Sequence, residues 1–328
     1  MPSSASTLAN KQTMSLDQLV SQALSGNQRA LSRVATIIES ESAQALAVRQ
    51  LLRGKGGRAR IIGITGPPGA GKSSILASIA ARISLSGKSV AIIAVDPTSP
   101  ISGGAILGDR IRTSEVSLRP NVFVRSLASR SRIDGLAPAA LAIIRLFDAA
   151  GFDYVFLETV GAGQNQFEIA NYVHTLVLVE APGAGDSVQM LKAGIMELAD
   201  IYAVNKADMP GAHLVSRELR AMLTLGDNVS GDWQPPIVLC SSETGEGFDA
   251  LIQAIDDHGA HLRKSGSIQE RSVRMARTET VNAVQKLVER FLDRDQGLIA
   301  AVADGTHTPE QAAGKLLSRV SQMPRSET

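Results

Sequence analysis

A run of eight residues has the types and spacing needed to bind the phosphates of a nucleotide. The run is Gly66-Pro67-Pro68-Gly69-Ala70-Gly71-Lys72-Ser73, and it fits the P-loop pattern GxxxxGK[ST]. Its glycines let successive backbone N–H groups turn toward anionic oxygens, the helix that begins here adds a partial positive charge, and Lys72 adds a full one. The Ser73 hydroxyl can ligate Mg²⁺. We predict that these eight residues and Ser74 bind a nucleoside triphosphate with its metal ion.

Three acidic residues could complete the metal site. Asp96 and Glu158 each directly follow an apolar run, and Asp109 lies in a glycine-rich connection. Mg²⁺ prefers oxygen ligands, and an open α/β sheet binds its ligands at the carboxyl ends of its strands. We therefore predict that Ser73, Asp96, Asp109 and Glu158 ligate the metal; a solvated acid is the alternative for each acid, and most of all for Asp109. Gly161 would allow a backbone N–H to meet the γ-phosphate.

A second motif predicts which base is bound. The tetrapeptide Asn205-Lys206-Ala207-Asp208 follows another apolar run. Guanine presents two adjacent N–H donors that one carboxylate, Asp208, can accept together, whereas adenine offers no such pair. Lys206 can lay its methylene stem on the purine face. Ser241 and Ser242, which precede two glycines, would supply the loop that closes over the base oxygen, although an ordinary turn is the alternative there.

These motifs require a sheet whose strands carry them to one edge. Seven short runs rich in β-branched residues alternate with helical patterns, which is typical of a mostly parallel sheet flanked by helices. The predicted strands are Ile61–Ile64, Val90–Val95, Val122–Val124, Tyr154–Leu157, Thr175–Val179, Ile201–Val204 and Ile237–Cys240. The fold class is therefore α/β, a P-loop NTPase with helical extensions at both ends.

The extensions set the expected domain boundaries. Residues 1–14 form a disordered N-terminus, 15–57 an N-terminal helical arm, 58–264 the P-loop domain and 265–328 a C-terminal helical arm. The N-terminal arm should hold two helices, one beginning at Ser15 and one after Asn27. In the C-terminal arm, a last helix should begin at Thr308-Pro309, and an earlier apolar stripe must pack on its own domain or on a second copy of the chain.

Composition excludes several other classes. The chain has 328 residues, a formal net charge of +1 and 3% aromatic residues, so it lacks the charge expected of a nucleic-acid-binding protein. Its single cysteine, Cys240, excludes a disulfide framework, and no apolar run reaches the ~20 residues of a membrane span. No signal-type segment begins the chain, so we expect a cytoplasmic protein. His258 and His261 share one helix face, and we expect both to be surface residues.

Taken together, these motifs and their flanking residues closely resemble the MeaB/ArgK family over about residues 15 to 290. The matching segments are Asp96-Pro97-Thr98-Ser99-Pro100, Ser102-Gly103-Gly104-Ala105-Ile106-Leu107-Gly108-Asp109-Arg110, Glu158-Thr159-Val160-Gly161-Ala162-Gly163-Gln164, Gly185-Asp186, Leu191-Lys192-Ala193-Gly194 and Asn205-Lys206-Ala207-Asp208. Members are G-protein chaperones of adenosylcobalamin-dependent acyl-CoA mutases.

The resemblance implies a function and an assembly. It implies GTP hydrolysis that gates loading of adenosylcobalamin into a partner mutase, of the methylmalonyl-CoA mutase type, and protects or reactivates that mutase. It implies a homodimer whose contact is carried by the C-terminal arm. It also assigns the Mg²⁺ and hydrolysis residues to Lys72, Ser73, Asp96, Asp109 and Glu158. The run Arg130–Leu136 departs from the family's glycine-rich pattern, which leaves the identity of the mutase open.

Two other functions remain as alternatives. One is a GTPase that inserts nickel or another metal into an enzyme, although Cys240 and the scattered histidines form no compact set of soft ligands. The other is a kinase that transfers the γ-phosphoryl group to a small acceptor, although the guanine motif argues against an ATP-using kinase.

Overall fold

The computed structural model describes residues 14–40, 42–97, 114–129, 139–159, 168–184, 195–225 and 232–321. The chain divides into two compact units, residues 1–271 and residues 272–328. Within the described residues, no helix is long and apolar enough to cross a membrane.

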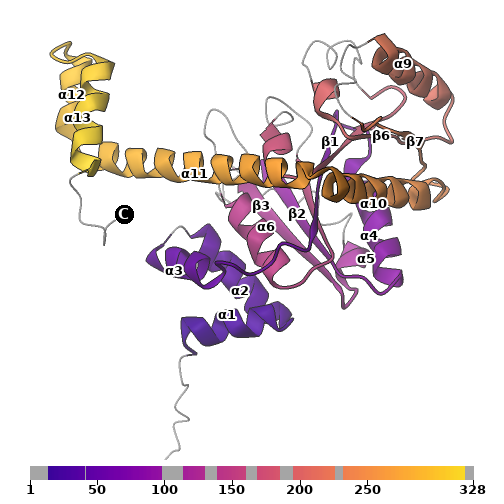
Figure 1. Ribbon diagram of the computed structural model, residues 1–328, viewed down its shortest axis with the longest axis horizontal. Helices are drawn as coiled ribbons and strands as arrows, with labels where there is room; N and C mark the ends of the chain where they lie inside the picture. Colours follow the sequence, from indigo (N-terminus) through magenta and orange to yellow (C-terminus); the bar gives the residue numbers. More distant parts are fainter. Residues whose placement is uncertain are drawn as a thin grey trace, which may run out of the picture. The chain divides into compact units, whose positions relative to one another are not determined.

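A seven-stranded sheet forms the centre of the first unit (Figure 1). Its strands are β1 (Arg60–Thr65), β2 (Val90–Pro97), β3 (Val122–Ser129), β4 (Tyr154–Thr159), β5 (Thr175–Glu180), β6 (Ile201–Val204) and β7 (Ile237–Leu239). They lie in the order β3-β2-β4-β1-β5-β6-β7, and every pair is parallel. The predicted α/β class is confirmed, and all seven predicted strands are present.

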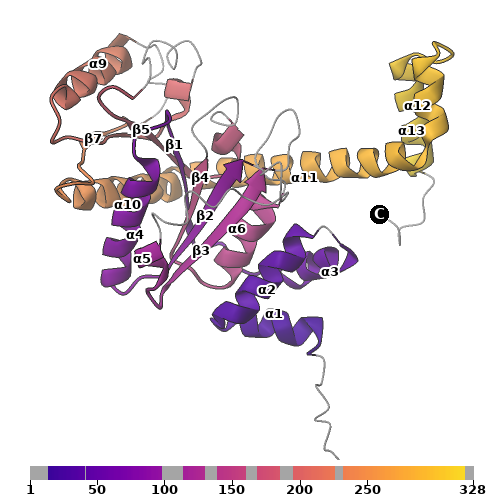
Figure 2. The same cartoon turned by 180° about the vertical axis from the view of Figure 1, so that it is seen from behind.

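Helices cover both faces of this sheet (Figures 1 and 2). The bounds are α4 (Lys72–Leu85), α5 (Ser114–Ser117), α6 (Ala140–Ala149), α9 (Ala212–Leu225) and α10 (Phe248–Ser265), with 3₁₀ turns at Ile169–Asn171 and Ile195–Leu198. On β5, Val177 and Val179 pack in the core under α4 and α10, whereas Leu178 packs with the buried residues of α9. Side chains on a strand alternate between faces, so α9 covers the opposite face. Burial on both faces explains why the strands read as continuous apolar runs.

Three N-terminal helices pack on one another, and the middle one also packs on α6: α1 (Leu16–Leu24), α2 (Gln28–Glu39) and α3 (Ala43–Leu51). The capping box of Ser15 and Gln18 is present as predicted. The run after Asn27, expected as one helix, is two: α2 ends at Glu39 with Ser40 as its C-cap, and α3 begins after its N-cap Ser42. The segment after α3 is joined to α6 by hydrogen bonds. The Asp148 carboxylate of α6 accepts them from the backbone N–H groups of residues 57–59.

The second unit contains most of α11 (Ser267–Arg294), and also α12 (Gln296–Ala303) and α13 (Pro309–Ser321). Its core is a small cluster of Leu298, Ala312 and Leu316 with four partly buried neighbours: Val288, Phe291, Leu292 and Val302. Helix α13 begins at Pro309, as predicted, with Thr308 and Gln311 bonded to each other's backbone. Helix α12 was not predicted, although Asp295 caps it by accepting the backbone N–H of Leu298 at its carboxylate.

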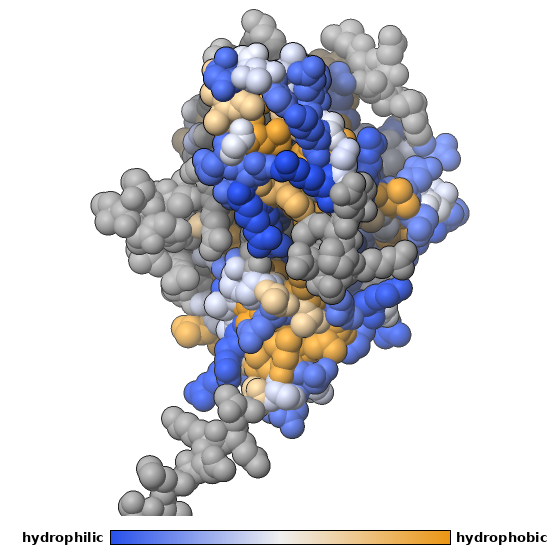
Figure 3. Space-filling model, turned by 90° about the vertical axis from the view of Figure 1, so that its left-hand side faces the viewer, coloured by the Kyte–Doolittle hydropathy of each residue, from blue (hydrophilic) through white to orange (hydrophobic). Residues whose placement is uncertain are grey.

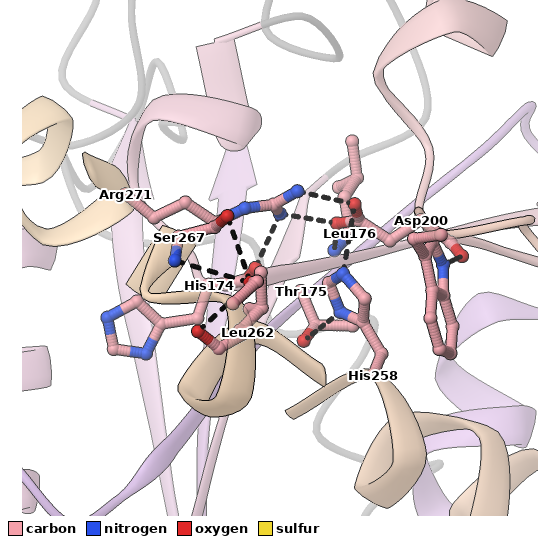
Figure 4. A network of polar contacts seen from close by, with 10 residues as sticks. His174, Thr175, Leu176, Asp200, His258, Leu262, Ser267 and Arg271 are labelled. Carbon is pink, nitrogen blue, oxygen red and sulfur yellow. Dashed lines mark hydrogen bonds and ion pairs between the residues drawn. The ribbon is translucent and has the colours of Figure 1, made fainter. Parts of the chain in front are cut away.

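A buried polar cluster lies at the amino ends of β5 and β6 (Figure 4). We call it the amino-edge network and define it as Thr175, Asp200, His258 and Arg271. The Asp200 carboxylate accepts hydrogen bonds from both terminal nitrogens of Arg271, each at 2.7 Å, and lies 3.3 Å from Nε2 of His258. The other ring nitrogen of His258 lies 2.9 Å from the Thr175 hydroxyl. His258 is only 1% exposed, so the prediction of a surface histidine was wrong at this position.

Candidate nucleotide-binding site

The predicted P-loop connects β1 to α4 at the carboxyl edge of the sheet. Its glycines are required by their surroundings. Gly66 has a φ of 144°, and a Cβ built there would lie 2.1 Å from the carbonyl oxygen of Val179; Gly71 has a φ of 86°, and its Cβ would lie 2.2 Å from the side-chain nitrogen of Asn205. No side chain fits at either position. The loop therefore brings backbone N–H groups to the N-terminus of α4, where an anion is favoured.

Lys72, the first residue of α4, is 8% exposed and is held close to the loop that precedes it. Its ammonium group donates hydrogen bonds to the carbonyl oxygens of Gly66 and Pro67, both at 3.0 Å. The site therefore places a buried cation on the loop that would surround the phosphates.

Ser73 and Glu158 meet beside Lys72. The Ser73 hydroxyl donates a hydrogen bond of 2.6 Å to the Glu158 carboxylate, and both residues are buried. Glu158 lies in register with Ile64 of β1 on one side and with Ala94 of β2 on the other. A hydroxyl and a carboxylate oxygen so close together are the donor types that Mg²⁺ takes in proteins.

Not every predicted metal ligand can be placed. Asp96 lies near the end of β2, two residues beyond the partner of Glu158, but its side chain is outside the described residues. Asp109 and Gly161 also lie outside the described residues.

The residues predicted to bind the base come together next to the P-loop. The Asn205 side chain donates to the carbonyl oxygen of Ala70 at 2.9 Å and accepts from the backbone N–H and the hydroxyl of Ser242 at 3.3 and 3.2 Å. The Ser241 hydroxyl donates to the Asp208 carboxylate. Lys206 has a φ of 57°, the one positive value at a non-glycine residue in the described chain. The two motifs thus form one continuous site.

The sequence analysis did not select one buried acid at the carboxyl edge of the sheet. Glu180 ends β5, is 4% exposed, and accepts the backbone N–H of Asn205 at its carbonyl oxygen, at 2.7 Å. Burial raises the pKa of its carboxyl group to about 7. The signal that selected Asp96 and Glu158, an acid directly after an apolar run, also selects Glu180.

Comparison with known proteins decides the family. The family model described as "Methylmalonyl Co-A mutase-associated GTPase MeaB" matches residues 31–296. The chain belongs to the MeaB family. Members of this family are GTPases, so the chain is a GTPase that binds guanine nucleotide, and the predicted resemblance is confirmed.

Individual MeaB relatives match over nearly the whole chain. A protein of Pyrococcus horikoshii named as a GTPase is 40% identical over 93% of this chain and 98% of its own. The GTPase ArgK of Escherichia coli is 33% identical over 89% of this chain and 92% of its own. The solved structure of an LAO/AO transport system kinase is 25% identical and covers 96% of this chain and 100% of its own, with a TM-score of 0.65.

Proposed function

We propose that this GTPase acts as a G-protein chaperone that gates the loading of adenosylcobalamin into a partner acyl-CoA mutase and protects or reactivates that mutase. The observation that carries the proposal is the unbroken match of residues 31–296 to a mutase-associated family. The proposal places the protein in the cytoplasm, with a protein partner and with neither nucleic acid nor a membrane.

In the proposed hydrolysis step, Lys72 stabilises the negative charge that spreads over the transferring γ-phosphoryl group. Ser73 and Glu158 would hold Mg²⁺, with Asp96 and Asp109 as the further predicted ligands. The ion would neutralise charge on the β- and γ-phosphate oxygens. The Ser73 hydroxyl and the Glu158 carboxylate, 2.6 Å apart, would supply two oxygen ligands on one side of the ion.

At the other end, Asp208 would accept the two N–H groups of guanine. The Ser241 hydroxyl already donates to this carboxylate and so holds it in place. Lys206 would cover the purine face, Ser242 would close over the base oxygen, and Gly161 would contact the γ-phosphate. Burying charged hydrogen bonds to guanine would discriminate against adenine by several kcal/mol, which is about a hundredfold or more in affinity.

We further propose that the chain is a homodimer joined through its C-terminal arm. Three valines of α11, Val273, Val281 and Val284, are 57%, 47% and 53% exposed, and Ile299 and Leu317 are exposed as well. Hydrophobic residues also reach the surface among hydrophilic ones on the face drawn in Figure 3. A small unit with so few buried residues gains stability by covering these side chains with a second copy. Light scattering should give a dimer mass for the native chain and a monomer mass for the V281E/V284E variant; a native monomer would contradict the proposal.

The two alternatives differ from the proposal in measurable ways. A metal-inserting GTPase would need an accessible soft ligand, but Cys240 is fully buried and burial raises the pKa of its thiol to about 12. The kinase function is suggested by the name of the LAO/AO relative. Incubation with GTP and cell extract separates these functions: a switch releases free phosphate alone, whereas a kinase gives a phosphorylated acceptor.

The partner can be tested directly. The chain loaded with a non-hydrolysable GTP analogue should retain a cobalamin-dependent mutase from its source cell. Purified mutase should then take up adenosylcobalamin, followed by its absorbance spectrum, at a rate that differs between the GTP-analogue and GDP forms. The Asp208→Asn variant, which should bind guanine nucleotide about a hundredfold more weakly, is the matched control at nucleotide concentrations that load only the native chain. If no cobalamin enzyme is retained, or if uptake is the same with every nucleotide, the proposed role fails.

A further inference from the structure

Arg82 in the last turn of α4 is bound to the loop that follows β7. Its terminal nitrogen donates a hydrogen bond to the carbonyl oxygen of Gly245, and its guanidinium carbon lies 5.3 Å from the ring centre of Phe248. Its Nε lies 3.3 Å from the Asp249 carboxylate. Asp249 is 91% exposed, so this ion pair contributes little. The binding therefore depends on the Gly245 carbonyl and on the buried face of Phe248.

The loop bound by Arg82 is internally rigid. We call residues 241–247 the base loop. Its ends are joined by hydrogen bonds from the Gly245 N–H to the Ser241 carbonyl at 2.8 Å and from the Ser241 N–H to the Glu246 carbonyl at 3.1 Å. Gly247 has a φ of 80°, and a Cβ there would lie 2.0 Å from the carbonyl oxygen of Leu239. A loop held in this way behaves as one rigid unit, so the contacts that it makes with the rest of the site determine its position.

Two such contacts connect the base loop to the P-loop side of the site. Asn205 is one, because it bonds both Ala70 and Ser242. Arg82 is the other, because it extends from the helix whose first residue is Lys72. Arg82 lies ten positions after Lys72, so the two Cα atoms are about 15 Å apart along a rigid helix. Helix α4 thus presents the phosphate-binding lysine at one end and holds the base loop near the other.

We propose that Arg82 is a positioning residue for guanine recognition: it fixes the base loop at the distance from the P-loop that a bound guanine nucleotide requires. Arg82 acts through the Gly245 carbonyl and not by touching the nucleotide. This inference rests on the proposed guanine site and adds to it a residue outside its motifs. No sequence pattern selects Arg82, because its partner Gly245 is 163 positions away.

The test compares Arg82→Met, which keeps the apolar stem and loses the donors, with Arg82→Lys, which keeps one charged donor. Arg82→Met should weaken GDP binding about tenfold, as loss of one hydrogen bond from a charged group predicts. It should leave ADP binding and kcat at saturating GTP unchanged and raise KM. Arg82→Lys should restore most of the GDP affinity. Asp249→Asn, which removes only the exposed ion pair, is the matched control and should stay within twofold of the native chain.

Several results of these measurements would contradict the proposed role of Arg82. If Arg82→Met binds GDP as tightly as the native chain, or weakens GDP and ADP by the same factor, the positioning role is wrong, since a general structural effect would change both. The thermal midpoint of each nucleotide-free variant, measured alongside, identifies a folding defect, which would also contradict the proposal. If the native chain itself does not prefer GDP to ADP, the guanine site fails, and the Arg82 proposal fails with it.

Discussion

The two edges of the sheet use similar residue types for opposite purposes. At the amino edge, a cation and a carboxylate, Arg271 and Asp200, bond each other at 2.7 Å, and the backbone N–H of Leu176 adds a further bond to the carboxylate at 2.8 Å. At the carboxyl edge, Lys72 donates to backbone carbonyls on a glycine loop at a helix N-terminus. What separates a structural cluster from a binding site is therefore the backbone around it. A site for an anionic ligand needs a glycine loop whose N–H groups face the ligand, whereas the N–H of Leu176 at the amino edge is bonded to the protein's own carboxylate.

The largest difference between substitutions at the two edges is expected at Lys72. Lys72→Ala should reduce GTP hydrolysis about a thousandfold, because the charge that stabilises the transferring phosphoryl group is lost. Phosphate release under saturating GTP measures this. Lys88→Ala is the control, since Lys88 is a half-exposed amino-edge lysine near Asp256, and its turnover should stay within about twofold of the native value. Undiminished hydrolysis by Lys72→Ala would refute the assignment of the P-loop.

The amino-edge network should matter for stability and not for turnover. Asp200→Ala leaves Arg271 and His258 without their buried partner and should reduce the free energy of unfolding by about 3–5 kcal/mol. Denaturation by guanidinium chloride measures this change, and kcat should be that of the native chain wherever the variant is folded. Asp249→Asn, which breaks an exposed ion pair, should cost less than about 1 kcal/mol. A loss below about 1 kcal/mol for Asp200→Ala would show that the network is not structural.

The same substitution at both edges should have different results. Asp208→Asn should weaken GDP binding about a hundredfold and improve binding of xanthosine diphosphate, because xanthine presents a carbonyl where guanine presents an amine. Calorimetry with both nucleotides measures this exchange. Asp200→Asn should leave the preference for guanine unchanged. If Asp208→Asn keeps the native preference, another residue reads the base.

The dependence of stability on pH should differ in sign between the two edges. Burial lowers the pKa of His258 to about 4, although the nearby Asp200 raises it; its contribution is complete above about pH 6.5 and is lost as the pH falls toward 4. Burial raises the pKa of Glu180 to about 7, so its contribution is complete below about pH 4.5 and is lost as the pH rises toward 7. Each effect amounts to about 3 kcal/mol, and the two oppose each other between about pH 4.5 and 6.5.

Single variants separate the two effects. Over this range of pH, Glu180→Gln should make the free energy of unfolding rise more steeply with pH, because the opposing effect of Glu180 is removed. His258→Gln should make the free energy of unfolding fall as the pH rises, because of the two effects only that of Glu180 remains. Urea unfolding at several pH values measures both slopes. The same slope in both variants would contradict the assignment of opposite signs.

The sequence predicted those parts that depend on local pattern. Strands buried on both faces are apolar throughout, so all seven were found, and the P-loop and the Asn205–Asp208 motif lie where their strands carry them. The helix break after Glu39 was missed, because no glycine or proline marks it in the sequence. His258 was misplaced although it shares the three- and four-residue spacing of Leu251, Ile255 and Leu262, a buried stripe on α10. Contacts between distant positions, such as Arg271 with Asp200, leave no pattern in the sequence.

The single tryptophan of the chain lies tilted against the two histidines at the amino edge. The Trp233 ring centre lies 4.8 Å from that of His258 and 5.3 Å from that of His261, and its N–H donates to the Asp200 carbonyl at 2.9 Å. Intrinsic fluorescence excited at the indole band therefore originates from a single known place, far along the strands from the phosphates. The molecule carries its own optical probe for loosening of that end, and its signal should remain steady while GDP and GTP exchange at the other.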